Sequence, residues 1–511
     1  MRKLCYYMRT HSIDPSHKEL AMPEQRPSNS RPPNILLLMC DQLRQDALGC
    51  YGNPIVRTPH IDALAGQGVR FDNMFAAYPV CAPNRASIVT GRYPSVHRLR
   101  TNGQRLPKTE QTLMQILRNS GYATYGTGKM HFGPQWKWPA DGQPIKDPDP
   151  STAISPQPPE DAYPWYGFDR VALTEDHRMG PYGDYLAAHG YNVWDELHSA
   201  SYPQSATVRS PFPEEHHQTT WITDRALDLL GEHPADRPFF LWVSYVHPHH
   251  PFNPPAPYDT LYNPDEMPLP VWDEAEVEGW PEAYRHKYFA LGSGHEAVGL
   301  CDYCDDDWRR IKAYYYGMIS QIDANVGRLL EALRARGELD NTLILFTADH
   351  GENLGDHRLL FKGTTYDCVT QVPFVVRPPE TVPPTTRELL CSSIDILPTV
   401  LDLAGVAQPD PSPIQGQSLA PSVAGADQRL RSSVLIENGG IRRSIRTETA
   451  LLTWHGPDTR GELYDLVADP DCLANLWDAP EAAEGQSALL YELIHLMAAN
   501  VDPLPVKEGP W

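Results

Sequence analysis

Four apolar runs, each of strand length and each followed by polar residues, constrain the fold of this chain most. They are residues 34–41, 122–126, 239–246 and 343–347. Continuous apolar runs of this length are typical of strands buried on both faces, as in a parallel sheet covered by helices. Helical patterns alternate with them at 59–68, 86–90, 112–119, 219–231, 308–336 and 393–404. This alternation predicts an α/β fold with a mostly parallel central sheet, to which a short apolar run at 372–376 adds a further strand.

The last part of the chain has a different sequence pattern. Short strand patterns separated by turns occur at 434–437, 444–447, 450–453 and 462–466, and an amphipathic helix pattern follows at 487–499. Such spacing predicts a small antiparallel sheet. We therefore expect a main domain over 34–430 and a C-terminal antiparallel subdomain with a terminal helix over 431–511.

Three other stretches lack periodicity. Residues 133–215 and 253–300 are rich in Pro and polar residues, and we interpret them as irregular insertions that shape a pocket. Residues 1–33 are polar and Pro-rich, without an apolar stretch of signal-peptide length, and are predicted to form a disordered or extended arm.

Charge and cysteine content exclude several classes of function. The formal net charge of −22 argues against nucleic acids and anionic membranes as partners. No run of about 18 apolar residues occurs, which argues against a membrane span. Nine cysteines in 511 residues suit reduced thiols, so we expect a cytoplasmic protein. The lone Cys301-x-x-Cys304 pair is interpreted as structural, because neither a second pair nor a nearby His accompanies it.

Polar residues follow the four main strands at the point where each strand ends: Asp41-Gln42, Lys129-x-His131, His249 and Asp349-His350. Each group alone has an ordinary explanation, such as a turn, a solvated loop or a cation at a helix end. A parallel sheet, however, gathers the carboxyl ends of its strands along one edge, where ligands bind. Two carboxylates, an amide oxygen and an imidazole then form an oxygen-rich set that suits a hard divalent cation.

A fifth element contributes a thiol and a cation. The stretch Cys81-Ala-Pro-Asn-Arg85 precedes the helix pattern at 86–90 and is followed by Thr90-Gly91-Arg92. On its own it is equally well a buried Cys in a Pro-containing turn. Helix N-terminal amides would favour an anion there. Arg85, Lys129, His131 and Lys362 are candidate donors to the charged oxygens of a transferred group, and His249 is a candidate proton donor.

The motif Cys81-x-Pro83-x-Arg85 resembles the signature of the sulfatases, the formylglycine-dependent branch of the alkaline-phosphatase superfamily. The polar clusters are similar to their sulfatase counterparts in the same chain order, as is the stretch 463–470 with Asn475-Leu476. The resemblance covers roughly residues 34–480. It implies a three-layer α/β/α sandwich with a small C-terminal antiparallel sheet.

The resemblance also implies a role for each candidate residue. A formylglycine-generating enzyme would oxidise Cys81 to formylglycine, and one hydroxyl of its hydrate would attack sulfur. The metal ligands would be Asp41, Gln42, Cys81, Asp349 and His350. Arg85 would orient the formylglycine, and the residues that hold the sulfate would be Lys129, His131 and Lys362. His249 would protonate the departing alcohol, after which the second hydroxyl would expel sulfate.

Two departures from the commonest sulfatase pattern widen the choice of substrate. Asp41-Gln42 replaces Asp-Asp and Asp349-His350 replaces Asp-Asn, which resembles choline sulfatases and phosphonate monoester hydrolases. Asn102 lies where those hydrolases place a substrate-contacting Asn, whereas Lys129 and His131 are the sulfatase-type pair. We favour Ca²⁺ as the metal, and the imidazole makes Mn²⁺ an alternative.

The leading hypothesis is therefore hydrolysis of sulfate monoesters by an arylsulfatase-like enzyme acting on a small anionic ester. The alternative is a phosphonate monoester or phosphate diester hydrolase using the same site. A third hypothesis is a non-catalytic binder of sulfated or phosphorylated ligands with unmodified Cys81. We further expect a homo-oligomer.

Overall fold

The computed structural model describes residues 31–135, 155–192, 207, 209–289, 300–380, 382–409, 413–426, 429–457 and 459–501. The chain divides into two compact units, Met1–Pro32 and Pro33–Trp511, and every element below belongs to the second. The arm predicted at 1–33 lies almost entirely outside the described residues.

An eight-stranded sheet forms the centre of this unit, in the order β5-β4-β6-β1-β7-β8-β2-β9. Strand β1 (Asn34–Cys40) lies between β6 (Phe239–Tyr245) and β7 (Thr342–Ala348) and is parallel to both. Strands β4 (Ala123–Gly128) and β5 (Arg170–Leu173) extend the parallel part beyond β6. Every residue of β1, β6 and β7 is buried, as their continuous apolar sequences predict.

The other half of the sheet contains one reversal. Strand β8 (Phe374–Arg377) is antiparallel to both of its neighbours, β7 and β2 (Val69–Phe71). Strand β9 (Thr385–Arg387) then pairs in parallel with β2. Of the eight described strands only β8 runs against the rest, so the predicted mostly parallel sheet is confirmed.

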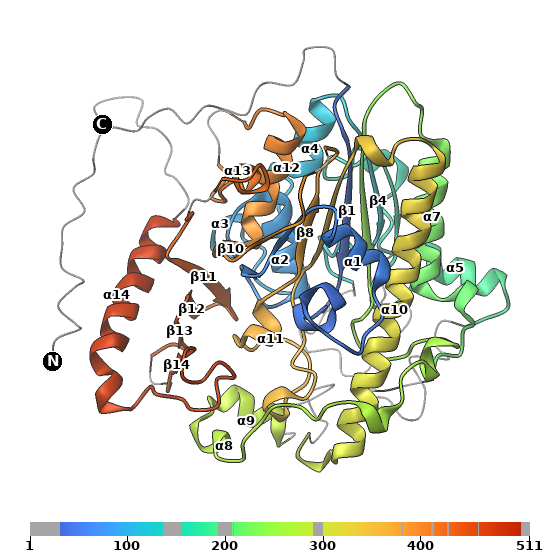
Figure 1. The fold of residues 1–511 in the computed structure, drawn as a ribbon. Coiled ribbons are helices and arrows are strands. Elements are labelled where there is room, and N and C mark those ends of the chain that lie inside the picture. The colour runs from blue at the N-terminus through green and yellow to red at the C-terminus, as the bar shows by residue number, and fades with distance from the viewer. Residues whose placement is uncertain are drawn as a thin grey trace, which may run out of the picture. The chain divides into compact units, whose positions relative to one another are not determined.

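Helices cover both faces of the sheet (Figure 1). One face carries α1 (Pro59–Ala65), α7 (Gln218–Glu232) and α10 (Asp305–Ala335). The opposite face carries α2 (Cys81–Thr90), α4 (Leu113–Asn119) and α12 (Ile396–Ala404). Shorter elements connect them: α3 (Pro94–His97), α5 (Pro181–Ala188), α8 (Glu276–Gly279), α9 (Glu282–Tyr288), α11 (Asp367–Thr370), α13 (Ala420–Val423) and the parallel pair β3 (Met74–Phe75) and β10 (Cys391–Ser392). The three-layer α/β/α arrangement is thus as predicted.

The structure differs from the sequence predictions at two places that matter for the site. Helix α2 begins at Cys81 rather than at residue 86, and each of its residues is buried. Strand β5 lies inside the stretch 133–215, for which we predicted irregular structure. That strand is short and lies at the sheet edge with Arg170 exposed, so it lacks the continuous apolar pattern that marks the central strands.

A second, four-stranded antiparallel sheet follows. It consists of β11 (Ser433–Asn438), β12 (Arg442–Thr447), β13 (Ala450–Trp454) and β14 (Glu462–Asp465) in sequential order. Helix α14 (Ala483–Ala499) packs against it through Leu493. The four predicted strands are confirmed, while the domain boundary near residue 431 stays a prediction.

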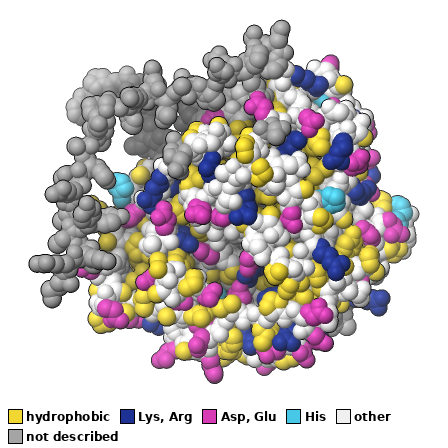
Figure 2. All heavy atoms as spheres, viewed as in Figure 1, with side chains coloured by type: hydrophobic (Ala, Val, Ile, Leu, Met, Phe, Trp, Pro, Cys, Tyr) yellow, Lys and Arg dark blue, Asp and Glu magenta, His cyan; other side chains and the backbone are white. Residues whose placement is uncertain are grey.

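Charged side chains of both signs are interspersed over the face drawn in Figure 2, so the net charge of −22 is not gathered into one acidic patch there. No helix within the described ranges is both long and apolar enough to cross a lipid bilayer.

Candidate active site

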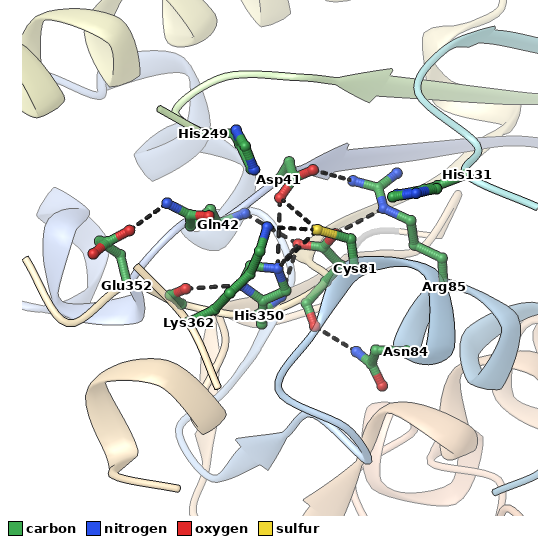
Figure 3. Close-up of polar contacts among 12 residues, drawn as sticks. Asp41, Gln42, Cys81, Asn84, Arg85, His131, His249, His350, Glu352 and Lys362 are labelled. Atoms are coloured by element: carbon green, nitrogen blue, oxygen red, sulfur yellow. Dashed lines mark hydrogen bonds and ion pairs between the residues drawn. The ribbon is translucent and has the colours of Figure 1, made fainter. Parts of the chain in front are cut away.

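The strand ends that carry polar residues come together because their strands are neighbours. Strands β4, β6, β1 and β7 are consecutive and parallel, so their carboxyl ends share one edge of the sheet. Helix α2 brings Cys81 to this edge with its first residue. Figure 3 shows the resulting cluster.

One half of the cluster is a group of potential metal ligands. Ligand atoms of Asp41, Cys81, Asp349 and His350 all lie within 4.8 Å of one another, and all four residues are buried. Cys81 Sγ is 3.2 Å from His350 Nε2 and 3.5 Å from Asp41 Oδ1. His350 Nδ1 lies 2.8 Å from the carbonyl oxygen of Gly351, which can only accept, so Nδ1 carries the proton. The lone pair on Nε2 therefore faces the carboxylates.

Gln42 completes this set with an amide oxygen. Its backbone N–H donates to Asp349 Oδ1 at 3.0 Å, in a left-handed conformation with φ of 65°. Its side-chain Nε2 donates to Glu352 Oε2, while Oε1 is buried and has no hydrogen-bond partner among the described residues. Two carboxylates, an imidazole nitrogen and an unsatisfied amide oxygen form a donor set that fits a hard divalent cation.

Three cations form the other half. Arg85 Nε donates to Asp349 Oδ2 at 2.7 Å, and Lys129 Nζ lies 2.6 Å from Asp41 Oδ2. Lys362 Nζ donates to Cys81 Sγ at 2.8 Å. Burial alone would raise the pKa of Asp41, but Lys129 and the neighbouring cations lower it well below its usual range. The cluster is thus a network of buried ion pairs around Cys81.

The Cys81 thiol itself is not activated. Burial, followed by Asp41, raises its pKa to about 12 against the opposing effects of Lys129 and Lys362. Because the thiolate is the reactive form of cysteine, an unmodified Cys81 is a weak nucleophile here.

The two predicted histidines outside the metal-ligand group, His131 and His249, lie at the site, and both are neutral. Burial and Lys129 hold the pKa of His131 well below its usual range. Burial and Lys362 lower the pKa of His249 to about 3. Nδ1 of His249 lies 2.6 Å from the carbonyl oxygen of His250, so it is the protonated nitrogen and Nε2 has a free lone pair. A histidine in water titrates near neutrality, and burial is the main reason that the pKa of His249 is lower.

Asn102 lies at the first turn of α2. Its exposed side chain accepts a hydrogen bond from the backbone N–H of Ala82 at 3.1 Å, directly after Cys81. The structure therefore brings every predicted site residue to one place.

Sequence reasoning missed four residues of this place. Asp176 forms an ion pair with Lys129, and Glu175 accepts from the backbone N–H of His131 at 2.9 Å. Glu352 holds Gln42, and Asn84 donates to the backbone oxygen of Asp349. Glu175 and Asp176 follow β5, so recognising that strand would have revealed them.

The exposed Cys301-x-x-Cys304 pair lies elsewhere. Cys304 caps α10, and its Sγ is 3.1 Å from Asp307 Oδ2. Neither cysteine belongs to a potential metal-ligand group within the part of the chain that the structure describes.

A buried nucleophile position, a hard-cation donor set and converging cations at the edge of an α/β sheet define a hydrolase site for anionic esters. The family model described as sulfatase matches residues 33–406, and the model described as N-sulphoglucosamine sulphohydrolase, C-terminal, matches residues 355–499. The chain belongs to the sulfatase family of the alkaline-phosphatase superfamily and is by that membership a sulfuric ester hydrolase.

The similar proteins include both sulfatases and a phosphonate monoester hydrolase. An arylsulfatase of Clostridium perfringens is 30% identical over 469 residues, covering 88% of this chain and 92% of that protein. A choline-sulfatase of Rhizobium meliloti is 30% identical over 473 residues, covering 89% and 85%. The structure of a phosphonate monoester hydrolase of Agrobacterium radiobacter superposes with a TM-score of 0.77 at 28% identity, covering 92% of this chain and 96% of that one.

Proposed function

We propose that the protein hydrolyses sulfate monoesters at the Cys81 cluster. The observation that carries this proposal is the placement of Cys81 Sγ, 2.8 Å from Lys362 Nζ and 3.9 Å from Lys129 Nζ, beside the potential metal ligands Asp41, Asp349 and His350. Cations that converge on a nucleophile position suit an anionic group in transfer, because preorganised charges stabilise its transition state.

Asp41, Gln42, Asp349 and His350 would hold one divalent cation, Ca²⁺ in preference to Mn²⁺ because oxygen donors predominate. The cation would lower the proton affinity of the attacking hydroxyl. That hydroxyl would come from residue 81 after a formylglycine-generating enzyme has oxidised the cysteine, which agrees with the weak nucleophilicity of the unmodified thiol.

The side chains of the protein would bind the substrate and orient the reacting groups. Lys129, Lys362 and His131 would contact the charged sulfate oxygens. Arg85 donates to Ser244 Oγ at 2.8 Å and to Asp349 Oδ2 at 2.7 Å, so its guanidinium is held rigidly behind residue 81. Asn102 would contact the substrate from the turn that lies beside the start of α2.

His249 would transfer a proton to the departing alcohol oxygen. Its Nε2 is free to take up that proton from solvent before the transfer, since Nδ1 already donates to the carbonyl oxygen of His250. An anionic ester bound beside Lys362 would offset the cation that lowers the pKa of His249, so substrate binding would favour the protonated imidazole.

Phosphonate monoester or phosphate diester hydrolysis is the second candidate. Gln42 and His350 at the ligand positions favour it, as does the similarity to the Agrobacterium phosphonate monoester hydrolase. A multifunctional alkaline phosphatase superfamily protein of Trinickia caryophylli, 32% identical over 413 residues and covering 76% of this chain and 77% of that protein, points the same way.

The deciding experiment compares kcat/KM for an aryl sulfate monoester and an aryl phosphonate monoester with the same leaving group. The protein is co-expressed with a formylglycine-generating enzyme, and the state of residue 81 is determined by mass spectrometry. A preference for sulfate of about 10³ or more supports the proposal, because it requires over 4 kcal/mol of differential transition-state binding. A preference for phosphonate supports the second candidate. Turnover by the Cys81→Ala variant near the normal rate would exclude both mechanisms, and a binder of sulfated ligands would show neither modification nor turnover.

We also propose a homo-oligomer, a cytoplasmic location and a subdomain boundary near residue 431. The exposed Tyr491 and Ile494 on α14 support a subunit contact, and the eight described cysteines are all free thiols, which suits a reducing compartment. Light scattering and cell fractionation test the first two, and limited proteolysis tests the third.

A further inference from the structure

Asp176 is a carboxylate in a pocket that must accept an anion. It follows strand β5 and forms an ion pair with Lys129, whose Nζ also contacts Asp41 Oδ2 at 2.6 Å. Gln135 Nε2 donates to the second oxygen of Asp176 at 3.2 Å. The Asp176 side chain retains 29% of its exposure, whereas Lys129 is fully buried, so Asp176 lies on the open side of the lysine.

Asp176 also lies beside the residue expected to protonate the leaving group. Ligand atoms of Asp41, Asp176 and His249 lie within 4.8 Å of one another. Lys129 and His249 both have proposed contacts to the bound ester, and Asp176 adjoins both. The charge of this carboxylate repels an anionic substrate.

The formal charges of the pocket show what this carboxylate changes. Within the ion-pair network around Cys81, leaving aside Glu175, Glu352 and the proposed divalent cation, the cations Arg85, Lys129 and Lys362 are matched by the anions Asp41, Asp349 and Asp176. Without Asp176, these side chains would carry a net charge of one positive unit. Because Coulomb energy scales with the charge of the ligand, Asp176 repels a doubly charged group twice as strongly as a singly charged one.

We propose that Asp176 is a specificity-determining residue that restricts the site to esters whose transferred group carries a single negative charge. Sulfate monoesters, phosphonate monoesters and phosphate diesters belong to that class, and phosphate monoester dianions are excluded from it. This inference rests on the proposed function, since it assigns the charge class of the substrate at the same site.

The test uses Asp176→Asn, which removes the charge and keeps the shape. At pH 8 the substrates are an aryl sulfate and an aryl phosphate monoester with one leaving group, and the readout is the ratio of their kcat/KM values. We expect the phosphate-to-sulfate ratio to rise about 10- to 100-fold in Asp176→Asn, as one unit of charge removed close to the ligand predicts. Asp176→Glu restores the charge and should return the ratio to within about threefold of wild type.

Asp184→Asn is the matched control. Asp184 is an exposed residue of α5 in the same part of the chain, so its substitution changes the net charge equally without touching the pocket. We expect the ratio to be unchanged in this variant. An unchanged ratio in Asp176→Asn, or an equal loss of both activities, would overturn the proposal and assign Asp176 only to positioning Lys129.

A binding measurement separates this inference from the proposed function. Calorimetry with inorganic sulfate, which carries two charges, and sulfamate, which carries one, requires no turnover. Asp176→Asn should tighten sulfate binding about tenfold more than sulfamate binding, and equal tightening contradicts the inference. A wild-type protein that carries formylglycine and fails to cleave the aryl sulfate would refute the proposed function, while the calorimetry would still decide the role of Asp176.

Discussion

His249 is the residue whose protonation state matters most for the proposed chemistry. It is neutral in the structure, with Nδ1 bound to the carbonyl of His250 and Nε2 free. Burial lowers its pKa most, followed by Lys362, and a bound anion would counter the effect of Lys362. Binding of an anionic ester would therefore favour the protonated form of His249, which is the form that can donate a proton.

This role predicts a dependence on the leaving group. His249→Ala should slow hydrolysis of an alkyl sulfate by about 10²–10⁴-fold, because a poor leaving group requires protonation. An aryl sulfate with an acidic phenol should lose far less activity. The measurement is the slope of log kcat/KM against the pKa of the leaving alcohol, which should steepen in the variant. Equal losses for all leaving groups would show that His249 binds the sulfate instead.

A second prediction at this scale concerns the orientation of the Gln42 amide. Glu352 Oε1 accepts the backbone N–H groups of Leu354 and Phe361, and Oε2 accepts Gln42 Nε2. In Glu352→Gln the amide oxygen would serve the two backbone donors, leaving an NH₂ group against Gln42. Gln42 would then flip and turn its NH₂ toward the metal position. Because groups that orient metal ligands govern affinity, we expect metal affinity to fall about 10- to 100-fold, measured by competition with a chelator.

Glu175→Gln is the control for that variant. Glu175 is also a buried carboxylate, but it accepts from His131 N–H and Gln135 rather than from a potential metal ligand. Its substitution should leave metal affinity unchanged. Equal metal affinity in wild type and Glu352→Gln would contradict the predicted flip.

At the scale of elements, the small C-terminal sheet supports the loop that carries Lys362. Asn438, at the end of β11, donates to the carbonyl oxygen of Gly363 at 2.9 Å, and Arg442, at the start of β12, donates to the same oxygen at 3.2 Å. The adjoining Thr365 hydroxyl lies 2.8 Å from that of Thr453 in β13. The catalytic edge of the large sheet thus depends on the second sheet for one cation.

The double variant Asn438→Ala/Arg442→Ala should therefore lower kcat/KM about 10- to 100-fold, because a displaced cation stabilises the transition state less. Arg443→Ala is the control, as Arg443 donates to the backbone of its own hairpin. An unaltered kcat/KM in the double variant would show that Lys362 is positioned by other contacts.

The packing of α1 on α10 predicts a dependence of stability on pH. Asp323 of α10 accepts the backbone N–H groups of His60 and Ile61 at 3.0 and 2.8 Å. Burial raises its pKa to about 7. A carboxyl group with a raised folded-state pKa binds its proton more tightly in the folded than in the unfolded chain, so its contribution to stability is lost as pH rises from about 4 to 7.

Asp323→Asn removes that titration and retains an oxygen for both N–H groups. The difference in Tm between variant and wild type should therefore shift in favour of the variant by about 1–3 °C between pH 5 and pH 8. A difference that is constant with pH would show that Asp323 does not titrate in this window.

At the scale of the whole molecule, the strands that could be predicted from the sequence are those that are buried along their whole length. Strands β1, β6 and β7 are apolar on both faces, so the polar residues that follow them, Asp41, His249 and Asp349, could be identified from the sequence. Short strands such as β5 are half exposed and lack that pattern, so Asp176 was missed. The sheet order β4-β6-β1-β7 results from long-range pairing, which no local pattern encodes, and the lowered pKa of His249 depends on the burial that this pairing creates.

The burial of α2 limits the time during which Cys81 can be oxidised. Cys81 has no exposed surface, and it is enclosed in a helix whose other residues are buried as well. A modifying enzyme cannot reach this side chain once the sheet and α12 have closed around it. The proposed oxidation must then occur on the nascent chain, before folding is complete. Folded, unmodified protein incubated with a formylglycine-generating enzyme should retain its Cys81 thiol in a mass spectrum, while a peptide spanning residues 77–93 should be converted. The active fraction of the protein would thus depend on whether oxidation precedes folding during synthesis. Molecules that fold before Cys81 is oxidised would remain inactive.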